Sequence, residues 1–188
     1  MSYTPEIRAD YDTRISPLHK AVATLQRQYL DTADLLSHVD HAREVIGGSR
    51  VNSIRSLLDG LSEELGSCLS LVKNRMRSLS PELVQFPRTE VEPQAFWRLF
   101  RTDGSDCSGH LEALLSGYVH YARATSDSMN LLEMLGDTES VAAMKQIFGA
   151  ADKGIWFIEL YMEGLALRMD TAQLPKFTAD ICDSVAHE

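Results

Sequence analysis

The chain has few cysteines and none at metal-binding spacing. Its 188 residues include three, Cys68, Cys107 and Cys182, which lie far apart and form no Cys-x-x-Cys motif. A structural zinc site or a disulfide framework needs thiols that are more numerous or closer together. We therefore expect reduced cysteines. A chain of this length can bury an adequate core without disulfides or a structural metal.

Long apolar runs are also missing. Hydrophobic residues make up 44% of the sequence, yet no stretch approaches the roughly 18 apolar residues that a membrane span requires. The first residues, MSYTPEIRADYDTR, carry charges and contain no apolar core, unlike a signal or transit peptide. We expect a cytoplasmic protein with no membrane partner.

Basic residues are outnumbered by acidic ones. Eighteen lysines and arginines face 27 aspartates and glutamates, which gives a net charge of −9. This charge opposes binding to the phosphate backbone of nucleic acids. The N-terminal segment does not reverse it, because residues 1–20 contain three basic and three acidic side chains. DNA is therefore not an expected partner.

No segment alternates polar and apolar residues with the period of a strand. Apolar residues instead recur at helical spacing in four long stretches, which predicts an all-α protein. Capping signals bound these stretches, with Ser16-Pro17 at the first start and Gly136-Asp137 at the last turn. The predicted helices cover residues 16–46, 50–79, 108–135 and 138–169.

The connection between the second and third helices is long. Residues 80–106 contain three prolines and an aromatic run that predicts a short helix near 94–100. Two tight turns and one long crossover are typical of a ferritin-like four-helix bundle. We expect a single domain with an N-terminal tail at 1–15 and a C-terminal tail at 170–188. The C-terminal tail is expected to form a short extra helix or to stay loose.

Carboxylates and histidines offer two weak metal constellations. Ferritin-like di-iron bundles use Glu-x-x-His pairs, and this sequence contains none, which argues against that site. On the first predicted helix, one stripe of side chains would either bind a divalent cation or form a solvated polar face. The stripe consists of Asp34, His38, His41 and Glu44. Asp59 and Glu63 on the second helix would join that stripe or remain surface carboxylates.

Several fragments occur in a recognisable order. Residues 136–140 read Gly-Asp-Thr-Glu-Ser, and residues 152–159 read Asp-Lys-Gly-Ile-Trp-Phe-Ile-Glu. Upstream lie Leu-Leu-Asp-Gly at 57–60 and His110 with Tyr118. In this order, over roughly residues 18–165, the fragments resemble the helices of Dps-type mini-ferritins. The resemblance implies a hollow shell of twelve subunits that oxidises ferrous iron with peroxide and stores the ferric product.

The resemblance also implies a ferroxidase centre between two subunits, and most of its ligands are replaced here. His41 and Asp59 match two ligands, although no tryptophan follows the histidine as it does in the family. Arg55 replaces another histidine, and Ser70 and Asn74 replace an Asp-x-x-x-Glu motif. A guanidinium cannot ligate iron, and the two neutral groups bind it weakly. We expect weak ferroxidase activity or none.

Three functions remain open from the sequence. The first is a Dps-like shell protein of iron homeostasis or oxidative-stress protection, with Arg55 paired to Asp59 in place of iron. The second is an active ferroxidase that uses relocated ligands. The third is a noncatalytic interaction protein, or a subunit that assembles with a paralogue. The candidate ligands of the second function are His38, His41, Glu44, Asp59 and Glu63.

Acidic residues gather around the turn between the last two helices. In the family this turn lines the three-fold pores through which iron enters. Glu133, Asp137 and Glu139 would form an electronegative funnel there if the shell assembles. Acidic side chains near a helix N-terminus also stabilise the helix dipole, which is the alternative explanation.

Overall fold

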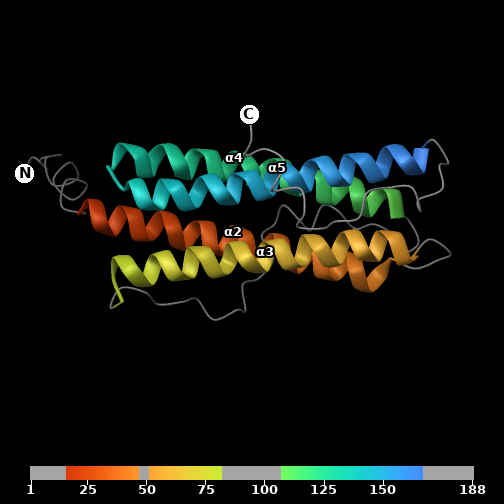
Figure 1. Ribbon diagram of the computed structural model, residues 1–188, viewed down its shortest axis with the longest axis horizontal. Helices are drawn as coiled ribbons and strands as arrows, with labels where there is room; N and C mark the ends of the chain where they lie inside the picture. The colour runs from red at the N-terminus through yellow and green to blue at the C-terminus, as the bar shows by residue number, and fades with distance from the viewer. Residues whose placement is uncertain (1–15, 47–50, 82–106, 167–188) are drawn as a thin grey trace, which may run out of the picture.

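The computed structural model describes residues 16–46, 51–81 and 107–166, which form four α-helices and no strand (Figure 1). The predicted all-α four-helix bundle is confirmed. The expected tails at 1–15 and 170–188 and the short helix near 94–100 lie outside the described residues. The helices are α2 (Pro17–Val45), α3 (Val51–Leu79), α4 (Cys107–Met134) and α5 (Thr138–Ala166).

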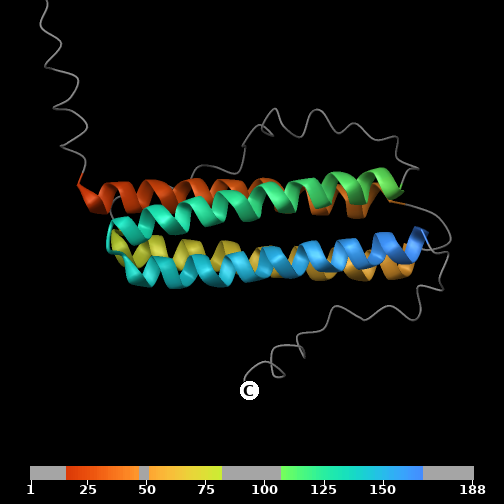
Figure 2. The same cartoon turned by 90° about the horizontal axis from the view of Figure 1, so that it is seen from above.

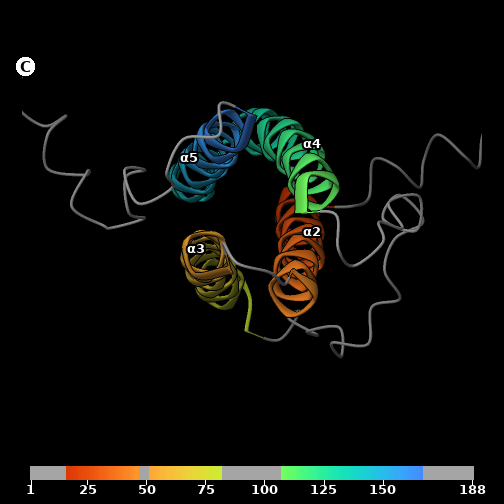
Figure 3. The same cartoon turned by 90° about the vertical axis from the view of Figure 1, so that its right-hand side faces the viewer.

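The four helices stand at the corners of a square (Figure 3). Helix α2 packs against α3 and α4, and α5 packs against the same two helices from the opposite corner. Each helix runs antiparallel to both of its neighbours (Figures 1 and 2). Helix α3 therefore ends at the opposite end of the bundle from the start of α4, so the intervening chain joins the two ends. One such crossover is the connectivity of ferritin-like folds.

Local hydrogen bonds define the helix ends that the sequence predicts. The Ser16 hydroxyl accepts a hydrogen bond from the His19 amide at 3.4 Å, with Pro17 in the first turn. Gly136 has a φ of 75° and ends α4 in a Schellman turn, in which the Asp137 amide donates to the Leu132 carbonyl. The same aspartate then caps α5 by accepting from the Ser140 amide.

The core combines an apolar interior with one polar contact line between α2 and α4. The hydroxyls of Thr32 and Thr125 donate to carbonyls of their own helices. They therefore accept across the bundle, from the Tyr121 hydroxyl at 2.7 Å and from the Gln28 amide at 2.8 Å, respectively. These bonds set the register of the two helices. The largest fully buried side chains include Leu25, Leu35, Leu57, Leu58, Leu61, Leu65, Met76, Leu111, Tyr118, Leu132, Met144 and Phe157.

Helices α4 and α5 approach closely at one glycine. The Tyr118 ring lies against the backbone of Gly154, where a Cβ atom would overlap the ring. The glycine thus admits an aromatic side chain between the two helices. None of the four described helices has the length and hydropathy that a membrane crossing requires.

Candidate functional site

The structure spreads the predicted site residues over three parts of the bundle. Asp34 and His38 are half-buried on α2, and the remaining candidates on α2 and α3 are exposed. Across the described ranges, no group of three or more His, Cys, Asp or Glu side chains is arranged to hold a metal ion. The relocated ligands therefore do not converge among the described residues of one chain. The exposed candidates are His41, Glu44, Arg55, Asp59, Glu63, Ser70 and Asn74.

The histidines cluster where α2 ends and α4 begins. The rings of His41 and His110 meet edge to face, with centroids 6.4 Å apart. His38 lies one turn earlier, with Nε2 3.8 Å from Asp34 Oδ1. Burial, aided by the charge of His41, lowers the pKa of His38 to about 4. The His38 imidazole is therefore neutral near pH 7.

Asp59 forms an ion pair with an arginine that lies far from it in the sequence. Arg43 of α2 reaches across to α3, where its Nη1 lies 3.3 Å from Asp59 Oδ1. Its Nη2 lies 3.6 Å from Asp40 Oδ1, and this second carboxylate also accepts a hydrogen bond from Ser62 at 3.0 Å. The expected partner, Arg55, does not pair with Asp59. A cation does pair with Asp59, but it comes from the neighbouring helix.

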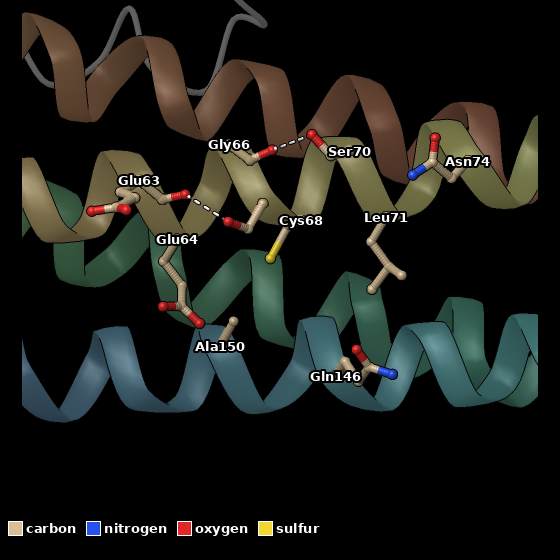
Figure 4. A pocket seen from close by; sticks show the side chains of 10 residues that line it. Glu63, Glu64, Gly66, Cys68, Ser70, Leu71, Asn74, Gln146 and Ala150 are labelled. Atoms are coloured by element: carbon tan, nitrogen blue, oxygen red, sulfur yellow. Dashed lines mark hydrogen bonds between the residues drawn. The ribbon is translucent and has the colours of Figure 1, made fainter. Parts of the chain in front are cut away.

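The matched positions Ser70 and Asn74 line an open groove of about 540 Å³ between α3 and α5 (Figure 4). Ser70 donates its hydroxyl to the Gly66 carbonyl at 3.0 Å, and Ser67 donates to the Glu63 carbonyl at 3.1 Å. Both hydroxyl donors are thus engaged by their own helix. The groove lining also includes the carboxylates of Glu63 and Glu64, whereas Ser70 and Asn74 present neutral groups at the two positions where the resemblance implies carboxylates.

Two further residues at this groove, Glu64 and Cys68, are unreactive. The Glu64 carboxylate lies 3.6 Å from the Lys153 ammonium of α5. Cys68 is buried at the groove, and burial raises the pKa of its thiol to about 12. A thiol that stays protonated near neutral pH is a poor nucleophile and metal ligand. Neither residue supplies a reactive group.

The acidic turn between α4 and α5 is partly neutralised by Arg75 of α3, a residue that no local motif pointed to. Arg75 Nη2 lies 2.7 Å from Asp137 Oδ1, Nε donates to the Ser140 hydroxyl at 2.8 Å, and Nη1 pairs with Glu139. Burial would raise the pKa of Asp137, but hydrogen bonds from Ser140 and Arg75 lower it overall. Two of the three predicted funnel carboxylates therefore share one guanidinium, which offsets one of their two negative charges, while Glu133 is exposed.

Comparisons with known proteins do not supply a family. No protein-family model matches the sequence, and no curated protein matches it either. The likeness to Dps-type mini-ferritins rests on the fragments described above.

Proposed function

We propose that the chain is the subunit of a Dps-like shell, active in iron homeostasis or oxidative-stress protection, that lacks an efficient ferroxidase centre. The observation that carries the lack of a ferroxidase centre is the ion pair between Arg43 and Asp59. It places a cation on the carboxylate that matches a family ligand. The one-crossover connectivity of the bundle supports the same family assignment.

The electrostatics of this face disfavour ferrous iron. A metal ion at Asp59 must displace Arg43, whose guanidinium already bridges two carboxylates. Arg55 adds a second, exposed cation one turn earlier on the same helix. Iron needs several hard oxygen or imidazole ligands, which this face supplies only in part. We therefore expect surfaces rather than iron chemistry to dominate the function.

The direct test is the mass of the purified protein by light scattering, with its iron content measured after aerobic ferrous loading with peroxide. We expect a mass near twelve subunits and almost no stored iron. A monomer or dimer would contradict the shell. Hundreds of irons per shell that disappear in His41→Ala with Asp59→Ala, but persist in the exposed control Glu163→Ala, would contradict the loss of the ferroxidase centre.

A gain-of-function variant tests whether replaced ligands account for the expected lack of ferroxidase activity. Arg55→His, Ser70→Asp and Asn74→Glu together restore the ligands that the family resemblance implies. With Arg43→Ala to release Asp59, this variant should oxidise ferrous iron faster than the natural chain. Unchanged oxidation by a correctly assembled shell would show that the matched positions are not remnants of a metal site.

Wild-type oxidation that survives the loss of both His41 and Asp59 would contradict the alternative of a ferroxidase with relocated ligands, because that site draws on both residues. The noncatalytic alternative draws on the end of α4, where Met134 is 78% exposed beside the exposed Leu131. Such an apolar end suits a subunit that assembles with a paralogue. In that case the chain alone would stay small and reach the shell mass only when the paralogue is added.

A further inference from the structure

The outer side of α5 exposes two aromatic side chains. Helix α5 occupies one corner of the bundle, so one of its sides points away from the other three helices (Figure 3). Trp156 is 50% exposed and Phe148 is 38% exposed. The Trp156 ring packs edge to face on the buried Phe157, with centroids 4.8 Å apart, so the indole is held in place at the surface. Exposed and fixed aromatic side chains of this kind are typical of a protein contact site.

A recess lies beside this tryptophan. The indole borders an open groove of about 380 Å³ whose lining also includes Gly149, Asp152 and Ile155. At Gly149 the space where a Cβ atom would project is open. Gly149 precedes Trp156 by seven residues, which is about two helical turns, so both residues lie on the same face of α5. This face therefore combines a bulky protrusion with a hollow about 10 Å away.

Charges on the same face are arranged symmetrically about Asp152. Lys145 lies seven residues before this aspartate and Glu159 seven residues after it, and both side chains are exposed. The two opposite charges thus stand about 10 Å to either side of Asp152 along the helix. When two α5 helices pack antiparallel around a twofold axis at Asp152, Lys145 of each copy meets Glu159 of the other. The face is therefore complementary in charge to a second copy of itself.

We propose that α5 docks on α5 of a second copy of this chain, antiparallel, with Trp156 of each copy seated over Gly149 of the other. The same arrangement brings Phe148 of each copy close to Ile155 of the other, because these residues lie four before and three after the axis. A residue without a side chain lets the helices approach closely, and the indole fills the hollow. A tryptophan in such a pocket near the centre of an interface is a typical hot spot.

One contact opposes the pair. The two exposed Asp152 carboxylates meet at the axis, where like charges repel, so Asp152→Asn should strengthen the association. The inference does not rest on the proposed shell. A pair that forms without a shell would contradict only the proposed function, and a shell whose α5 helices do not pair would contradict only this contact.

A cysteine at the axis tests the contact directly. In a background of Cys107→Ser and Cys182→Ser, Asp152→Cys places two thiols opposite each other and should form interchain disulfides on mild oxidation. Cys68 is buried and stays protonated, so it does not compete. Glu163→Cys is the matched control, because two copies of this exposed position lie about 33 Å apart in the proposed pair. We expect about tenfold more disulfide dimer from Asp152→Cys, since the pair holds its thiols at high effective concentration.

Charge exchange and a filled hollow distinguish this contact from a chance encounter. In the Asp152→Cys chain, Lys145→Glu should lower the disulfide yield about fivefold, and Lys145→Glu with Glu159→Lys should restore it. Gly149→Gln should also lower the yield, because its side chain blocks the indole of the other copy but meets open space in its own chain. Arg123→Glu, an exposed charge reversal on α4, is the control and should leave the yield unchanged.

Circular dichroism and light scattering check the fold and the mass of each variant. Equal yields at Asp152→Cys and Glu163→Cys, or no dimer at either position, would overturn the proposal. A yield that Lys145→Glu leaves unchanged, or that the double exchange with Glu159→Lys does not restore, would also overturn it, because the charges of α5 would then not meet across the contact.

Discussion

The two ends of the bundle each hold an arginine between carboxylates, but in different surroundings. Arg75 has only 14% of its side chain exposed, and its partner Asp137 has 12%. Arg43 and Asp59 are 39% and 56% exposed. Burial strengthens the interaction of charges and makes an unpaired charge costly, while solvent weakens both effects. The arginine–carboxylate pair therefore stabilises the fold at the buried end of the bundle, whereas the pair at the exposed end contributes little to stability.

The difference has a consequence for function. Arg75 joins α3 to the α4–α5 turn through Asp137, Glu139 and Ser140, so it forms part of the fold. Arg43 bridges Asp40 and Asp59 at the surface, where a competing cation has access. If any metal site persists in this protein, the exposed end is the place where substitution can reveal it without unfolding the bundle.

Removal of Arg75 should produce the largest loss of stability. Arg75→Ala leaves Asp137 mostly buried beside an empty site, and we expect the free energy of unfolding to fall by about 2–4 kcal/mol. Urea denaturation followed by circular dichroism measures this change. Arg77→Ala, an exposed neighbour on the same helix, is the control and should change stability by less than about 0.5 kcal/mol. Equal effects would contradict the structural role of Arg75.

As the pH falls, we expect the two ends of the bundle to lose stability one after the other. The pKa of His38 falls from 6.5 to about 4 in the folded chain, so the unfolded chain binds more protons between these values. Stability is therefore lost as pH falls from 6.5 toward 4. Asp137 acts at still lower pH, because its lowered pKa contributes stability that disappears as that carboxyl is protonated. The histidine end thus responds first.

The measurement is urea unfolding at pH 7 and pH 4.5. We expect a loss of about 2 kcal/mol that is attributable to His38. His38→Leu should remove most of this pH dependence, while the exposed control His120→Ala should retain it. Asp34 and His41 face His38, so Asp34→Asn and His41→Ala separate the influence of each from that of burial. If the free energy of unfolding of His38→Leu depends on pH as strongly as that of the natural chain, another group titrates.

Local structure was readable from the sequence because its causes lie within a few residues. The cap at Ser16 and the turn at Gly136 depend on hydrogen bonds over three to five positions, and helical periodicity reports which face is buried. The Arg75–Asp137 pair joins residues 62 positions apart. Only the antiparallel packing of α3 on α5 brings them together, so no local spacing pointed to that contact.

The site was less predictable for the same reason. The resemblance to mini-ferritins implied replaced iron ligands and a cation near Asp59, and it suggested Arg55, four positions away on the same helix. The observed partner, Arg43, crosses from α2. Arg43 lies sixteen positions from Asp59, and the choice of this arginine over the nearer Arg55 depends on side-chain direction at a helix–helix contact, which residue spacing alone does not specify.

The smallest change in stability is expected when Arg43 is replaced, and this substitution most directly tests the difference between the two ends of the bundle. Because both partners are largely solvated, Arg43→Ala should lower the free energy of unfolding by less than about 1 kcal/mol. Arg43→Lys retains the charge and serves as the control. Titration with a divalent metal ion should show stronger binding in Arg43→Ala than in Arg43→Lys, because only the first variant releases Asp59. Equal binding would mean that the remaining groups of this face do not favour a metal even without the guanidinium, and that the exposed end serves only as protein surface.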